Sequence, residues 1–98
     1  MHQLSRQARD DLDGIWEYIV RESGSETIAD RKIIAITDRF YLLSRHPKIG
    51  RTRDDELGQG TRSFPVDDYI IVYDLIGEDV RILRVAHGRR NLVALFGR

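Results

Sequence analysis

Apolar residues in the first half of the chain recur every three or four positions, which is the spacing of a helix that buries one face. One stripe lies between Ser5 and Gly24 and consists of Ala8, Leu12, Ile15, Trp16 and Ile19. A second lies between Ser25 and Pro47 and consists of Ala29, Ile33, Ile36, Phe40 and Leu43. The two serines are suited to cap the helix starts, and Gly24 is suited to end the first helix in a left-handed conformation. So short a break predicts an α-hairpin, two antiparallel helices side by side.

In the second half the apolar period changes to two, which indicates strands. Residues 69–75 and 80–86 are rich in β-branched and aromatic side chains, and Gly77-Glu78 between them predicts a tight hairpin turn. Centring the hairpin on that turn places Asp74 opposite Arg81, and these opposite charges support the register.

Continued without interruption, this register adds the pairs Leu75–Val80, Tyr73–Ile82, Val72–Leu83 and Ile71–Arg84. One face of the hairpin then carries Ile70, Val72, Leu83 and Val85. The other carries Tyr69, Ile71, Tyr73, Leu75, Val80, Ile82 and Arg84. Both faces are too apolar for water, so we expect one to lie on the helices and the other to be covered by the termini or by a partner.

The remaining segments are shorter. Residues 1–4 and 62–65 fit strands, and the polar, glycine-containing stretch 48–60 fits a loop with at most a turn of helix or strand inside it. Residues 91–96 form an apolar tail, which needs either the sheet or another protein to pack on.

Composition places the chain among globular proteins. Its 98 residues are 41% hydrophobic and 33% charged, which is enough for one small domain over residues 1–98. No apolar run is long enough to span a membrane, and no apolar signal segment follows Met1. The absence of cysteine excludes disulfides and thiolate metal sites, and a cytoplasmic location is the expectation.

Charge is balanced overall but unevenly distributed. Sixteen basic and sixteen acidic residues cancel, so direct binding of DNA by this chain is not expected. All the basic residues except Lys32 and Lys48 are arginines, and no acid follows Val80, whereas five arginines do: Arg81, Arg84, Arg89, Arg90 and Arg98. Guanidinium groups suit bidentate contacts to carboxylates or phosphates, so this end of the chain is either an anion-binding patch or a set of local ion pairs.

Motifs of cofactor or metal chemistry are missing. The sequence has no phosphate-binding glycine loop, and its three histidines (His2, His46 and His87) are far apart, so we expect neither a cofactor nor a metal. The one enzymatic alternative is metal-free RNA cleavage, which needs a base, an acid and cations around the phosphate. Candidates for base and acid are Glu56 and His87, and candidates for the phosphate clamp are Arg62, Arg84, Arg89 and Arg90.

Four blocks of sequence, in this order, resemble a known family. They are the helix sequence that ends in Ile15-Trp16-Glu17-Tyr18-Ile19, then residues 46–51, then residues 62–66 leading into 69–73, and finally residues 82–90. Over essentially its full length the chain resembles the ParE branch of the RelE/ParE toxins of bacterial type II toxin–antitoxin modules.

The resemblance implies a β-α-α-β-β-β fold of the α+β class, with an N-terminal α-hairpin packed on an antiparallel sheet. It also implies a hetero-oligomer with a ParD-like antitoxin, a ribbon-helix-helix protein whose C-terminal segment wraps and silences the toxin. Released ParE-like toxins poison DNA gyrase, whereas RelE-like relatives cut mRNA on the ribosome with a basic and aromatic set. The scarcity of lysine departs from the RelE pattern and favours a gyrase inhibitor without catalytic residues.

A toxin of this kind needs one surface for its antitoxin and another for its target. For the antitoxin we expect the apolar sheet face and the outside of the α-hairpin, with candidates Trp16, Tyr18, Ile19, Phe40 and Tyr73, although Trp16 and Phe40 also fit the core. For the target we expect Arg84, Arg89, Arg90, Leu95 and Phe96. A ribosome-dependent endoribonuclease and an inactive remnant that only binds its antitoxin remain the alternatives.

Overall fold

The computed structural model describes residues 1–96, so Arg98 lies outside the described part of the chain. Two long helices are followed by a sheet with short helices around it. In chain order the elements are β1 (His2–Leu4), α1 (Arg6–Ser23), α2 (Glu26–Arg45), β2 (Arg51–Thr52), α3 (Asp54–Leu57), β3 (Arg62–Val66), β4 (Tyr69–Ile76), β5 (Asp79–His87) and α4 (Leu92–Leu95). The strand order is β1-β5-β4-β3-β2. β1 joins β5 in parallel, and every other pairing is antiparallel.

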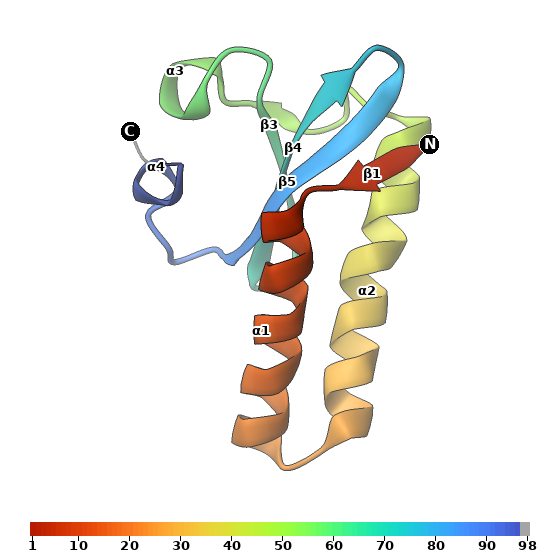
Figure 1. Ribbon diagram of the computed structural model, residues 1–98, viewed down its shortest axis with the longest axis vertical. Helices are drawn as coiled ribbons and strands as arrows, with labels where there is room; N and C mark the ends of the chain where they lie inside the picture. The colour runs from red at the N-terminus through yellow and green to blue at the C-terminus, as the bar shows by residue number, and fades with distance from the viewer. Residues whose placement is uncertain (97–98) are drawn as a thin grey trace.

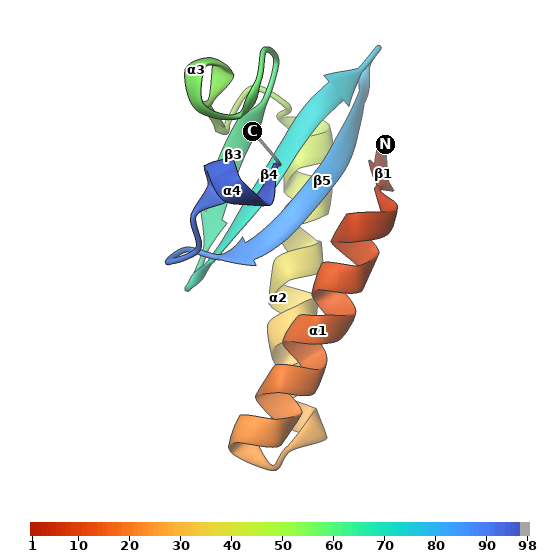
Figure 2. The ribbon, with the colours of Figure 1, turned by 60° about the vertical axis from the view of Figure 1, so that its left-hand side comes forward.

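The sheet separates the long helices from the short ones. The α-hairpin packs on one side of the sheet and extends beyond it, while α3 and α4 lie on the opposite side (Figures 1 and 2). The main core lies between the α-hairpin and the sheet, and it includes Ile36, Phe40 and Leu43 from α2 with Ile71, Tyr73 and Ile82 from the strands. The apolar second face predicted for the sheet is thus partly covered by the chain's own short helices.

Local capping fixes the α-hairpin as expected. The Ser5 hydroxyl accepts a hydrogen bond from the Ala8 N–H at 3.0 Å, and the Ser25 hydroxyl accepts one from the Ile28 N–H at 3.2 Å. Gly24 ends α1 with a φ of 71°, a left-handed conformation that glycine adopts without strain. The predicted helices and their caps are confirmed.

The β4–β5 hairpin confirms the three predicted pairs nearest the turn and corrects the other two. Near the turn, Asp74 pairs with Arg81 as expected, but a β-bulge follows at Val72/Tyr73. Beyond it Val72 lies opposite Arg84 and Ile71 opposite Val85, so the predicted pairs Val72–Leu83 and Ile71–Arg84 are wrong. Because the bulge puts one extra residue in β5, the later side chains exchange faces. Val85 therefore joins the main core, at 2% exposure, and Arg84 leaves that face.

Tyr73 anchors the segment that follows α2. Its buried hydroxyl donates to the Pro47 carbonyl at 2.8 Å and accepts from the Gly50 N–H at 2.9 Å. A Cβ on residue 50 would collide with the Tyr73 hydroxyl, which explains the glycine there. Arg62 adds hydrogen bonds to the carbonyls of Lys48 and Gly50, at 3.1 and 2.8 Å. The predicted loop therefore leaves α2 in a fixed direction, and it contains the short elements β2 and α3.

Within the described residues, no helix has the length and apolar character needed to cross a membrane.

Candidate protein-interaction site

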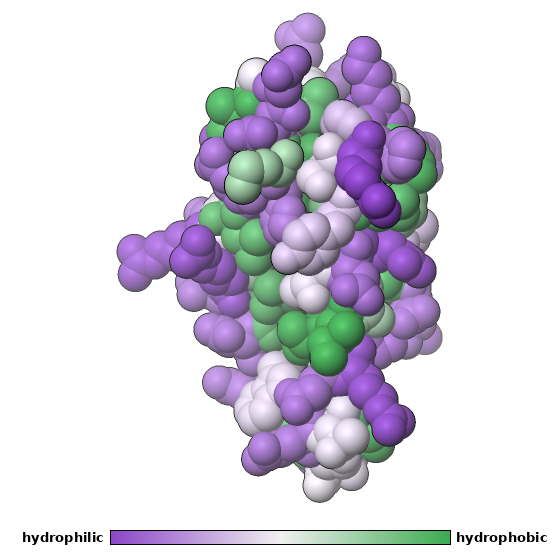
Figure 3. Space-filling model, turned by 90° about the vertical axis from the view of Figure 1, so that its right-hand side faces the viewer, coloured by the Kyte–Doolittle hydropathy of each residue, from purple (hydrophilic) through white to green (hydrophobic). Residues whose placement is uncertain are grey.

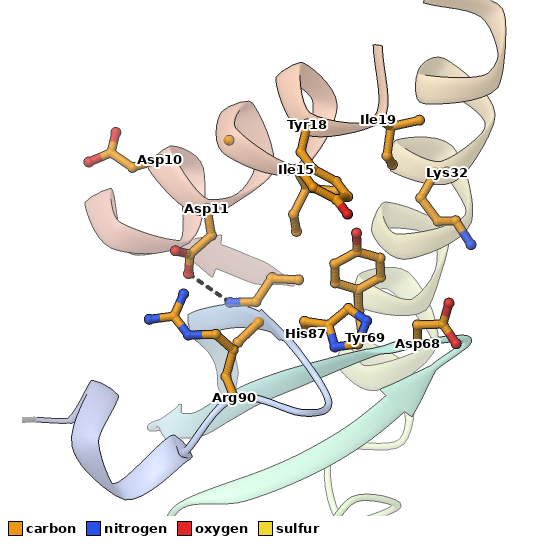
Figure 4. Close-up of a pocket in the computed structure, with 13 residues that line it drawn as sticks. Asp10, Asp11, Ile15, Tyr18, Ile19, Lys32, Asp68, Tyr69, His87 and Arg90 are labelled. Carbon is orange, nitrogen blue, oxygen red and sulfur yellow. Dashed lines mark hydrogen bonds between the residues drawn. The ribbon is translucent and has the colours of Figure 1, made fainter. Parts of the chain in front are cut away.

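A cleft of about 740 Å³ lies between α1, the start of β4 and the end of β5. Its floor is apolar and includes Ile15, Ile19 and Val85. Figure 4 shows that α1 supplies one wall and that residues at the sheet end, including Tyr69 and His87, supply the other. An apolar floor with polar walls is typical of a recognition site for another molecule.

Aromatic side chains line the middle of the cleft. Tyr18 is 53% exposed, whereas Tyr69 is 8% exposed, and their hydroxyls point toward one another in Figure 4. The ring of His87 meets Tyr69 edge-on, with centroids 5.5 Å apart. Burial raises the pKa of the Tyr69 phenol above its ordinary value, so this group stays neutral at physiological pH. Aromatic residues are enriched at protein interfaces, so the exposed Tyr18 ring is a candidate contact for a partner.

Asp11 closes the edge of β5 beside the cleft. β1 pairs with β5 only as far as Ile82, and beyond that point the Asp11 carboxylate accepts from the Val85 N–H at 2.9 Å. The same carboxylate accepts from Nε and Nη2 of Arg84, at 2.8 and 2.9 Å. This charged hydrogen bond raises the pKa of Arg84 above its ordinary value. The Asp11 side chain thus binds a backbone N–H that a neighbouring strand would otherwise bind, and it also holds the Arg84 guanidinium in place.

Basic side chains on and after β5, and Lys32 on α2, differ in whether a carboxylate pairs with them. Arg81 is paired with Asp74 at 2.7 Å, and Lys32 with Asp67 at 3.1 Å. Arg89 and Arg90 are exposed, and within residues 1–96 no salt bridge engages either of them. The local ion-pair interpretation therefore fits Arg81 and Arg84, and the anion-binding interpretation fits Arg89 and Arg90.

The residues expected to contact an antitoxin fall into two groups. Tyr18 and Ile19 line the cleft. Phe40 and Tyr73 are 1% and 0% exposed, so their assignment to a contact surface is corrected: both belong to the core. Trp16 is half-buried at the seam of the α-hairpin, where its indole N–H donates to Asp30 at 2.8 Å.

The outside of α2 is a weaker candidate than the cleft. Figure 3 views this side of the molecule and shows apolar and hydrophilic side chains interspersed over it. Exposed apolar residues of α2 include Ile28, Ile34 and Tyr41. The cleft combines an exposed aromatic group, Tyr18, with about 740 Å³ of concave surface, whereas the hollow beside Ile28 measures about 300 Å³.

The predicted target surface is only partly assembled. Leu95 and Phe96 are half-buried, because the tail folds back beside the sheet as α4, with Asn91 as its N-cap (Figure 2). Arg84 is bound by Asp11, and its Nη1 lies 3.4 Å from the Leu95 carbonyl oxygen. Arg89 and Arg90 lie in the segment between β5 and α4, so they are the exposed cations beside the tail.

The alternative nuclease residues are not brought together. Arg62 pairs with Tyr73 and His87 with Tyr69, which places them four residues apart along β4, roughly 13 Å at the usual rise of a strand. Glu56 is held by Arg53 at 2.7 Å. In the described residues, no three side chains of the kind that bind metal ions lie together.

Asp11 and Gly14 both line the cleft, and no role was predicted for either of them from the sequence. The partner of Asp11 is 73 positions away, and no local pattern identifies it. Gly14 does carry a signal, because glycine inside a helix costs about 0.5–1 kcal/mol relative to alanine. A Cβ at this position would meet nothing within 4 Å, so internal packing does not explain the residue.

Comparison with known proteins gives these features a context. Residues 3–92 match the family model of the ParE toxin of the type II toxin–antitoxin system parDE. The chain belongs to the ParE toxin family. Within that family, toxin ParE3 of Caulobacter vibrioides is 37% identical over 94 residues, covering 96% of this chain and 92% of the relative. The chain is thus a toxin of a type II toxin–antitoxin system, which confirms the resemblance drawn from the sequence.

Solved structures with the ParE-type fold agree. The chromosomal ParDE toxin–antitoxin system of P. aeruginosa matches with a TM-score of 0.76 at 23% identity, over 88% of this chain and 92% of that chain. The toxin–antitoxin complex RelBE2 of Mycobacterium tuberculosis matches with a TM-score of 0.65 at 27% identity, over 89% and 95%. The predicted α+β fold class is confirmed.

Proposed function

We propose that this toxin is silenced by a ParD-like antitoxin in the cytoplasm, and that the released toxin inhibits DNA gyrase by binding it, without breaking a bond itself. The observation that carries the proposal is the exposed pair Arg89 and Arg90 beside a folded apolar tail. Side chains of this kind suit a surface that docks on another protein, because arginine is enriched at interfaces and forms bidentate contacts with carboxylates.

The target-facing surface consists of Arg89 and Arg90 with Leu95 and Phe96. Arg84 lies beneath them as a structural residue, because its guanidinium is already bound by Asp11. The antitoxin surface includes the cleft, with Tyr18 and Ile19 on the α1 side. A ParD-like segment there forms the hetero-oligomer that the names of the ParDE and RelBE2 complexes state for those proteins.

A second candidate is a ribosome-dependent endoribonuclease of the RelE type. The likeness to the RelBE2 complex favours it, as does His87 lying against Tyr69 at the cleft. The separation of His87 from Arg62 and the pairing of Glu56 with Arg53 argue against it, since acid, base and phosphate clamp must meet around one phosphate. A remnant that binds only its antitoxin is the third possibility.

One experiment separates the three. The toxin is produced without its antitoxin, and growth, DNA supercoiling by purified gyrase, and transcript ends are measured. We expect growth arrest and gyrase inhibition, both lost in Arg89→Glu combined with Phe96→Ala. The matched control, Arg39→Glu with Arg45→Glu, changes two exposed arginines on α2 and should remain toxic. Transcripts cut within codons would establish the nuclease instead, and normal growth would establish the remnant.

A further inference from the structure

Neither the backbone geometry nor the internal packing requires glycine at position 14 of α1. It lies in the middle of the helix, away from the capped ends. The positive-φ glycines of the described chain are Gly24, Gly58, Gly60 and Gly77, so Gly14 is not among them. A Cβ on residue 14 would enter open space. The residue therefore weakens its own helix without a benefit inside the folded chain.

The open space beside Gly14 is the cleft. Asp11, Gly14 and Tyr18 all line it, at the spacing of one face of a helix. Between the Asp11 carboxylate and the Tyr18 ring, Gly14 has no side chain, so the backbone of α1 faces the cleft there. Two packed helices approach within 8–10 Å according to the side chains at their contact, and glycine permits the short end of that range.

We propose that Gly14 is the point of closest approach for a helix of the antitoxin, and that a large apolar side chain of that helix enters the cleft above Ile15 and Val85. The inference rests on the proposed function, because it assumes an antitoxin. It adds a residue that determines which antitoxin fits, since a Cβ or anything larger at position 14 moves the docked helix outward.

Charge and position select the antitoxin as the occupant. Arg90 lines the cleft and also belongs to the proposed target surface, so a chain that fills the cleft covers one of the two target-facing arginines. Asp10, Asp68 and Arg90 all line the cleft, and no salt bridge within residues 1–96 engages any of them. The arriving helix should therefore place an acidic side chain against Arg90 and keep acidic side chains away from the two aspartates. Occupation of the cleft thus neutralises part of the surface by which the toxin acts.

The test measures binding of the antitoxin encoded beside the toxin gene, as a full-length protein, to four variants by calorimetry. Gly14→Ala should weaken binding about tenfold, equivalent to about 1.4 kcal/mol, while raising the melting temperature of the free toxin by a few degrees. Gly14→Trp should weaken binding at least a hundredfold. Asp13→Ala and Glu17→Trp are the controls, because both residues are exposed on α1 outside the cleft and should keep the unaltered affinity.

The outcomes are distinguishable. If Gly14→Trp is folded, by its circular dichroism and melting temperature, and still binds the antitoxin normally, the inference is overturned while the antitoxin itself stands. If Gly14→Trp loses gyrase inhibition and keeps the antitoxin, the cleft serves the target and the inference is also overturned. If the unaltered toxin does not bind the antitoxin, the proposed function fails and the inference fails with it. Loss of antitoxin binding by Glu17→Trp to the same extent would show a general effect of bulk on α1 and would likewise refute the role of Gly14.

Discussion

Asp11 holds Arg84 through two parallel hydrogen bonds, of 2.9 Å to Nη2 and 2.8 Å to Nε, and accepts a third from the Val85 N–H. Both side chains are largely buried, at 16% and 21% exposure. The carboxylate therefore carries out two structural tasks at once: it fixes α1 against the sheet, and it terminates an open strand edge that would otherwise be free to pair with another chain.

Replacing Asp11 with asparagine should destabilise the toxin by about 1.5–3 kcal/mol, because a charged acceptor of three hydrogen bonds is lost and Arg84 keeps its charge. Urea unfolding followed by circular dichroism measures the change. Asp10→Asn, an exposed neighbour on the same helix, should have almost no effect. Equal stability of Asp11→Asn and the unaltered chain would contradict the structural role of this pair.

Replacing Tyr73 with phenylalanine should cost about 1–3 kcal/mol, because the Gly50 N–H and the Pro47 carbonyl lose a buried partner. Tyr41→Phe is the control, since Tyr41 is 62% exposed. Hydrogen exchange should also locate the effect, with faster exchange at the Gly50 amide. An unaltered exchange rate there would mean that the phenol is dispensable for this loop.

If the toxin acts by docking, as proposed, substitution of the candidate catalytic residues should leave toxicity unchanged. His87→Gln and Glu56→Gln remove the two side chains able to transfer a proton, yet a toxin that acts by docking does not need either of them. Growth arrest after induction is the measurement, with melting temperature as the check on folding. Folded variants that are both harmless, together with loss of transcript cleavage seen with the unaltered toxin, would contradict the docking proposal.

Stability should fall as the pH is lowered from 7 toward 5, and His2 should account for part of the slope. Burial against Phe40 and Tyr41 lowers the pKa of His2 below its ordinary value, and the nearby N-terminal ammonium group lowers it further. Protonation of the His2 ring is therefore less favourable in the folded state than in the unfolded state. The contribution of His2 to the free energy of unfolding is full above pH 6.5 and is lost as the pH falls. Urea midpoints across this range should show a shallower slope for His2→Phe. An identical slope for the two proteins would exclude the residue as the cause.

Short-range features were predictable from the sequence, because a few adjacent residues determine them. Ser5 and Gly24 mark the ends of α1 by side-chain capping and by glycine's access to positive φ, whatever the rest of the chain does. Asp74 and Arg81 flank a short turn, so that part of the hairpin register also followed from local sequence.

Longer-range features were not predictable in the same way. A strand pattern of period two does not reveal where one strand carries an extra residue, so the bulge that moves Arg84 and Val85 to exchanged faces could not be read from it. The partner of Arg84 lies on a helix 73 positions earlier, and an arginine without nearby acids therefore resembled a free one. Phe40 and Tyr73 fit both a core and an interface by composition, and only three-dimensional packing separates these two possibilities.

The position of β1 in the sheet determines when the sheet can be completed during synthesis of the toxin. Ser5, directly after β1, hydrogen-bonds to Leu83 of β5, 78 positions later, and β5 lies between β1 and β4 in the sheet. During synthesis the first strand is made long before its only neighbour, so a nascent chain cannot complete the sheet until nearly all of the described residues have emerged. Because residues 89–96 follow β5, the proposed target surface is also among the last parts of the described chain to be synthesised.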